Sequence, residues 1–168
     1  MINNTIRLAA PLQKESLIDG EGIRMVLWCQ GCRVRCPGCH NPETWNECQG
    51  KLYDIEEIKH TMKENSKNHN GITLTGGDPF LQPEQCLQIA RYAKEELNFN
   101  VWAYCGLTYE EILTYPDKLA LLRYVDILVD GPFVLQQRDI TLPFRGSSNQ
   151  RIIDVQESLK QNKVILYE

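Results

Sequence analysis

Short apolar runs alternate with amphipathic stretches along most of the chain. This alternation is typical of strand–helix units around a parallel sheet, because a strand buried on both faces is a continuous apolar run. The apolar runs predict strands at 23–28, 71–75, 101–104, 125–129, 151–155 and 163–167.

The stretches between these strands carry helix signals. Segment 54–67 has the apolar period of a helix, and Asp54 stands at the N-cap position. Pro83 suits the first position of a second helix, where a missing N–H costs nothing. Thr108 and Glu111 form the T-x-x-E pattern of a capping box that opens a third helix.

This order of elements predicts an α/β fold with about six mostly parallel strands in a partial, open (β/α) barrel. A closed eight-stranded barrel takes ~250 residues, whereas this chain has 168, with no repeat or linker. We therefore expect one domain over 1–168. Ligands of such sheets gather at the carboxyl ends of the strands, so the loops that follow the strands should converge on one edge.

The bulk composition narrows the range of partners. The net charge of −4 provides no basic field for nucleic acid. No apolar run approaches the ~20 residues of a membrane span. The first eight residues lack the layout of a secretion signal. We expect a cytoplasmic protein that contacts neither nucleic acid nor membrane.

Seven cysteines call for a chemical role. An odd count and no export signal argue against a disulfide framework. Cys32, Cys36 and Cys39 are spaced C-x3-C-x2-C on one short loop. Because four cysteines usually hold a [4Fe-4S] cluster, three would leave one iron open to a non-protein ligand. This spacing favours a three-cysteine iron–sulfur site.

Two alternatives include Cys29, which lies three positions before Cys32. One is a zinc site from two C-x2-C pairs, although zinc ribbons separate their pairs by ~15 residues and here three residues do so. The other is a four-cysteine cluster in a non-catalytic metal module or electron carrier. Both predict a site that protein ligands saturate.

The turn after the second of these strands is a further candidate. Gly76 and Gly77 allow the backbone to approach a ligand closely, and Asp78 offers a carboxylate for an amino group. Taken alone, this pattern is ordinary turn chemistry. It becomes informative one strand–helix unit after the C-x3-C-x2-C loop.

The two motifs together resemble those of the radical S-adenosylmethionine enzymes. Longer segments resemble the anaerobic ribonucleoside-triphosphate reductase activating proteins, a family of glycyl-radical activases. Two departures are Gly38, where many radical enzymes have an aromatic residue, and Cys105, where many relatives read Thr-Gly-Tyr. The likeness extends over 18–24, 30–32, 36–45, 126–133 and 145–151.

The resemblance implies a reaction and its participants. Cys32, Cys36 and Cys39 would hold a [4Fe-4S] cluster, and S-adenosyl-L-methionine would bind its fourth iron. Reductive cleavage would give a 5′-deoxyadenosyl radical, which takes hydrogen from a glycine of the glycyl-radical subunit of anaerobic ribonucleotide reductase. The electron would come from a low-potential donor such as flavodoxin or ferredoxin. An enzyme of this class that acts on another protein or a small molecule is the alternative.

The resemblance also assigns the cofactor pocket. Gly38, Cys39, His40 and Asn41 would border the adenosyl part. Asp130 either lies near the cofactor or is an ordinary turn residue, and 147–150 either faces the site or forms a polar surface loop. Gly76, Gly77 and Asp78 would border the methionine end.

Overall fold

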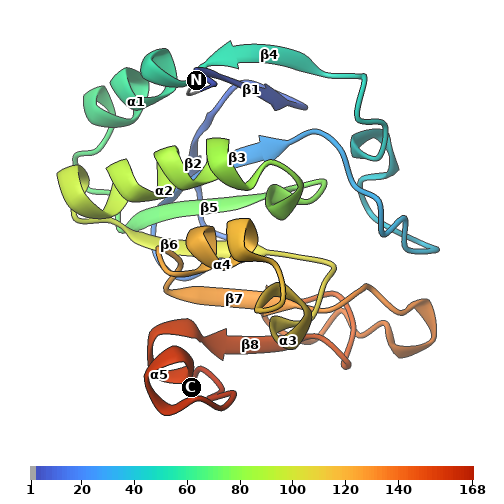
Figure 1. Ribbon diagram of the computed structural model, residues 1–168. Coiled ribbons are helices and arrows are strands. Elements are labelled where there is room, and N and C mark those ends of the chain that lie inside the picture. The colour runs from blue at the N-terminus through green and yellow to red at the C-terminus, as the bar shows by residue number, and fades with distance from the viewer. Residues whose placement is uncertain (1–2) are drawn as a thin grey trace.

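The computed structural model describes residues 3–168, which form one eight-stranded mixed sheet with helices against it (Figure 1). Strands β3, β5, β6 and β7 are parallel to one another, and the strands at both edges are antiparallel. The order across the sheet is β4-β1-β3-β5-β6-β7-β8, and β2 pairs with β3. The strands are β1 (Thr5–Leu8), β2 (Gln13–Ser16), β3 (Arg24–Cys29), β4 (Lys51–Asp54), β5 (Gly71–Gly76), β6 (Asn100–Tyr104), β7 (Ile127–Asp130) and β8 (Arg151–Asp154).

The helices begin where the capping residues predict. The Asp54 side chain accepts a hydrogen bond from the Glu57 N–H at 3.0 Å, and Thr108 and Glu111 form the expected capping box. The α-helices are α1 (Ile55–Glu64), α2 (Pro83–Leu97), α3 (Tyr109–Ile112), α4 (Pro116–Leu122) and α5 (Val155–Gln161), and the 3-10 turns are η1 (Pro42–Thr44), η2 (Pro79–Leu81) and η3 (Leu135–Gln137).

The open α/β sheet with a parallel core is confirmed, and the edges of the sheet differ from the prediction. Strands β1, β2 and β4 were not predicted, because β2 (QKES) and β4 (KLYD) are polar and largely exposed. The run 163–167 is not a strand and forms a single bridge between Ile153 and Leu166. Among residues 3–168, none of the helices combines the length and hydrophobicity of a bilayer-spanning segment.

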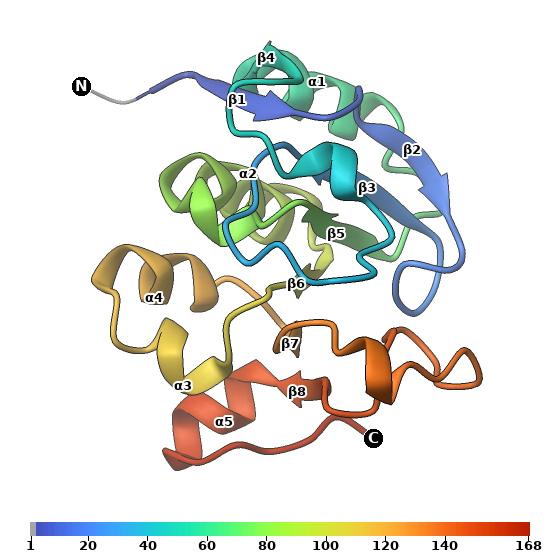
Figure 2. The same cartoon turned by 90° about the vertical axis from the view of Figure 1, so that its right-hand side faces the viewer.

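The two faces of the sheet carry different side chains, since residues of a strand alternate between faces. One face packs against helices that Figure 2 shows stacked beside the strands, and it contains Leu27, Leu74 and Leu128. The other face carries a smaller cluster around Trp102. Beside Trp102 lies the buried guanidinium of Arg24, and burial lowers the pKa of Arg24 to about 10.

Candidate functional site

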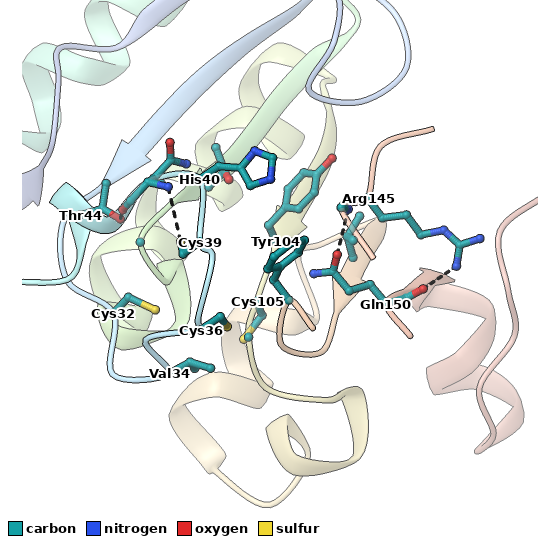
Figure 3. Close-up of a pocket in the computed structure, with 18 of the residues that line it drawn as sticks. Cys32, Val34, Cys36, Cys39, His40, Thr44, Tyr104, Cys105, Arg145 and Gln150 are labelled. Atoms are coloured by element: carbon teal, nitrogen blue, oxygen red, sulfur yellow. Dashed lines mark hydrogen bonds between the residues drawn. The ribbon is translucent and has the colours of Figure 1, made fainter. Parts of the chain in front are cut away.

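A cavity of about 420 Å³ lies at the carboxyl ends of the parallel strands (Figure 3). The loops that follow these strands converge there, as expected for a sheet of this type. One wall is the cysteine loop (residues 30–45), which follows β3. The other walls come from the turn after β5, from the end of β6 and from the segment after β7.

All three cysteines of the C-x3-C-x2-C motif line this cavity. A turn in which the Cys39 N–H donates to the Cys36 carbonyl at 3.0 Å brings these two residues together, and Gly38 adopts a positive φ of 78° within it. Burial raises the pKa of the Cys32 and Cys36 thiols. A bound metal reverses this effect, because a coordinated thiol is deprotonated.

The donor set fits an iron–sulfur cube. Within residues 3–168, no three His, Cys, Asp or Glu side chains are grouped closely enough to hold one metal ion. In a cube, each cysteine binds a different iron, so the three sulfurs need only surround a common volume. Cys32, Cys36 and Cys39 do so around one cavity.

Cys29 does not join the other three cysteines. Its side chain is fully buried in the core, and its Sγ lies 3.8 Å from the Sγ of Cys86. The zinc site and the four-cysteine cluster both need Cys29 at the cavity, and the structure places it on the helix-covered face of the sheet.

Cys105 is a cavity residue to which the sequence assigned no role. Its thiol lies 3.7 Å from Oδ2 of Asp78 and donates a hydrogen bond to that oxygen. Burial raises the pKa of Cys105 well above its ordinary value, and the nearby Asp78 charge adds to the effect. Cys105 is therefore a neutral hydrogen-bond donor beside the turn after β5.

The Gly-Gly turn supports the cysteine loop directly. The N–H of Gly77 donates to the Cys29 carbonyl at 2.8 Å, and the N–H of Asp78 donates to the Gly31 carbonyl at 2.8 Å. A Cβ on Gly76 or on Gly77 would clash with these same carbonyl oxygens. The sequence suggested close approach to a ligand, but the nearest neighbour is the end of β3 for Gly76 and the cysteine loop for Gly77.

The two carboxylates assigned from sequence are both held by protein groups. Asp78 is buried, its Oδ1 accepts the Phe80 N–H at 2.9 Å, and burial raises its pKa. Asp130 is buried as well and accepts hydrogen bonds from the Tyr109 N–H at 2.7 Å and from the Arg151 guanidinium. Gly76, Gly77, His40 and Asn41 line the cavity, whereas the buried Asp78 and Asp130 and the exposed Gly38 are not part of its lining.

The segment after β7 supplies cavity residues beyond those assigned from sequence. Gln150 reaches the lining, where its Oε1 accepts the Gly146 N–H at 2.9 Å and its Nε2 donates to the Gly131 carbonyl. The Tyr104 hydroxyl donates to the Phe144 carbonyl at 2.7 Å. Residues 147–150 were a recognisable signal, but their polar composition equally suited a surface loop.

Comparison with known proteins gives the class. A family model described as a 4Fe-4S single cluster domain matches residues 18–153. Together with the three-cysteine cavity, this match defines an iron–sulfur enzyme of the radical S-adenosylmethionine class. QueE from Escherichia coli aligns over 63% of this chain and 55% of its own, at a TM-score of 0.44 and 15% identity.

Curated relatives give the family. An anaerobic ribonucleoside-triphosphate reductase-activating protein from Haemophilus influenzae is 35% identical over 81% of this chain and 90% of its own length. The protein of that name from Vibrio cholerae is 36% identical over the same shares. The pyruvate formate-lyase-activating enzyme of Clostridium pasteurianum is 36% identical over 68% of this chain and 52% of its own. The chain belongs to the family of anaerobic ribonucleoside-triphosphate reductase-activating proteins, which are radical S-adenosylmethionine activases of glycyl-radical enzymes.

The position of Cys29 generates the first prediction. Cys29→Ala should leave the iron and sulfide content of anaerobically reconstituted protein unchanged, because its sulfur lies in the core beside Cys86. Cys32→Ala should lose most of both, because it removes one of three cluster ligands. Iron and acid-labile sulfide analysis checks the pair. Equal losses in the two variants would contradict the three-cysteine assignment.

The second prediction concerns the Gly-Gly turn. Gly77→Ala should destabilise the cysteine loop by about 2 kcal/mol, as overpacking does in a closed site, and should lower iron retention, because its Cβ meets the Gly31 carbonyl. Thermal unfolding and iron content measure the two effects.

Gly131→Ala is the matched control for this variant. Gly131 also lines the cavity, but the nearest atom to a Cβ there is 3.9 Å away, so only its positive φ of 91° adds strain. Equal iron retention in Gly77→Ala and the unaltered protein would show that the turn does not support the loop.

Proposed function

We propose that the protein uses S-adenosyl-L-methionine to install a glycyl radical in anaerobic ribonucleoside-triphosphate reductase. The observation that carries this proposal is a cavity lined by Cys32, Cys36 and Cys39 that Cys29 does not reach. The fourth thiol in the lining, Cys105, donates its hydrogen bond to Asp78. The named reductase activators support the target, because the chain covers 90% of the length of the Haemophilus and Vibrio proteins.

The bound cluster and cofactor would supply the radical chemistry, in which one electron cleaves the sulfonium and the resulting 5′-deoxyadenosyl radical takes a hydrogen atom from glycine. The chain would bind and orient these groups and exclude competing reactions. Cys32, Cys36 and Cys39 would hold three irons. No acid–base pair is needed for a hydrogen-atom transfer.

The remaining cavity residues would position the cofactor. Gly76 and Gly77 line the cavity and would border the methionine end beside the open iron. His40 and Asn41 would border the adenosyl part. Asp78 would act through the turn that it caps rather than by direct contact, since Phe80 and Cys105 already engage its two oxygens.

Apolar walls would protect the radical from water and from side reactions. Apolar side chains line the cavity from β3, from β7 and from the segment after β7: Trp28, Val129, Phe133 and Phe144. The His40 ring packs edge-on against Phe133, with ring centroids 5.5 Å apart, which joins the cysteine loop to the segment after β7. Asp130 would keep that segment in place through its ion pair with Arg151.

A second target is favoured by one relative. The Clostridium enzyme named for pyruvate formate-lyase activation shares 36% identity, although this chain covers only about half of it. Another glycyl-radical enzyme is therefore the competing substrate, and the same cavity would serve it.

The test of the target is a direct activation assay. The reconstituted protein, reduced with dithionite and mixed with S-adenosylmethionine and anaerobic ribonucleotide reductase, should produce a glycyl-radical EPR doublet on the reductase. Reductase labelled with deuterated glycine should transfer deuterium to 5′-deoxyadenosine. The Cys36→Ala variant serves as the inactive control. Cofactor cleavage without a radical on the reductase, but with one on pyruvate formate-lyase, would assign the second target.

A further inference from the structure

A second cavity of about 290 Å³ lies on the outer side of the cysteine loop, between that loop and η3. It shares Val34, Cys36 and Phe133 with the larger cavity. Cys36 therefore lies between the two cavities, with the larger cavity on one side and this outer cavity on the other.

The outer cavity is apolar and leads directly to a cluster ligand. Leu135, 46% exposed, lies at its surface, and the missing side chain of Gly38 lets Leu135 pack against the cysteine loop. Phe133 and Cys36 both line this cavity. A group bound here would therefore lie next to Cys36.

The rim of the outer cavity is basic, in contrast to the protein as a whole. Residues 33–40 and 131–138 contain three arginines and no acidic residue, whereas the net charge of the chain is −4. Glu47 pairs with Arg33 at 2.9 Å, and Asp139 directly follows Arg138, so three arginines and two acidic residues leave a net charge of 3 − 2 = +1 beside the cavity. Arg35 stands between Val34 and Cys36, which line the cavity, and Arg138 follows η3.

We propose that the outer cavity and its arginines are the docking site of the protein that reduces the cluster, a one-electron carrier with an acidic surface around its redox group. The inference rests on the proposed function, because a cluster that cleaves a sulfonium must be reduced first. One electron would pass from the carrier to the cluster on the side of Cys36, so the carrier is oxidised and the cluster reduced. No covalent bond forms or breaks at this face, and no proton is transferred there.

The two-sided wall is the reason for choosing this occupant. During the reaction the larger cavity must hold the cofactor and the glycine segment of the reductase, so electron entry needs another face. A small apolar contact inside a ring of opposite charge is typical of transient electron-transfer encounters. The reductase itself is the competing occupant, and the experiment separates the two.

The test measures cluster reduction without S-adenosylmethionine or reductase. Reduced flavodoxin, an acidic one-electron carrier, is mixed anaerobically with the reconstituted protein, and bleaching of the cluster absorbance is followed by stopped flow. Arg35→Glu should slow this reduction at least ~3-fold at low salt, and the difference should shrink at high salt, as for rim charges generally. Reduction by dithionite should keep its rate.

Two further variants sharpen the result. Gln136→Glu adds one negative charge to the cavity wall with almost no change of shape and should slow the flavodoxin reaction in the same way. Lys160→Glu reverses a 77% exposed charge on α5, outside both cavities, and should have no effect. Gln136→Glu carries the test by itself if Arg35→Glu fails to retain the cluster.

Three outcomes would overturn the proposal. Unchanged flavodoxin rates in Gln136→Glu would remove the docking site. Equal slowing with dithionite would place the effect on the cluster itself. Unchanged flavodoxin rates together with weaker activation of the reductase under dithionite would assign the face to the reductase. A wrong reductase target would leave the flavodoxin result intact, so the two proposals fail separately.

Discussion

The site depends on close backbone contact between the cysteine loop and the turn after β5. Two hydrogen bonds from Gly77 and Asp78 reach carbonyl groups on either side of Gln30, and the N–H of Gly31 donates to the Thr44 carbonyl at 2.7 Å. This contact holds both ends of the loop. Side chains at the two glycines would prevent it, because a Cβ on Gly76 clashes with the Cys29 carbonyl at the end of β3 and a Cβ on Gly77 clashes with the Gly31 carbonyl.

The loop in turn separates two surfaces, to which the proposals above assign different tasks. Its inner side carries three thiols toward the larger cavity, and its outer side meets Phe133 and Leu135 of the segment after β7. Hydrogen-atom abstraction needs a closed space, whereas electron entry needs a ligand close to the surface. Cys36 lines the cavities on both sides of the loop, as the two proposals together require. The Asp130–Arg151 ion pair ties the start of the segment after β7 to β8.

The sequence predicted the parallel core and the convergence of the loops, because buried strands are apolar and parallel strands end on one edge. Strands β2 and β4 were not predicted, because their residues are polar and their extended conformation is stabilised by pairing with a neighbouring strand. A carboxylate after a strand is visible in a sequence, but the direction of its oxygens is not. Asp78 and Asp130 accept hydrogen bonds from Phe80, Tyr109 and Arg151, which the sequence did not predict, and their contact with a cofactor stays a prediction.

The most direct test of the central claim is Mössbauer and EPR spectroscopy of protein reconstituted with iron-57. The account predicts that one iron of the cluster differs from the other three and that adding S-adenosylmethionine, labelled with nitrogen-15 at its amino group, changes its signal and shows coupling to the label. Four irons with protein ligands throughout, or a spectrum that the cofactor leaves unchanged, would contradict it.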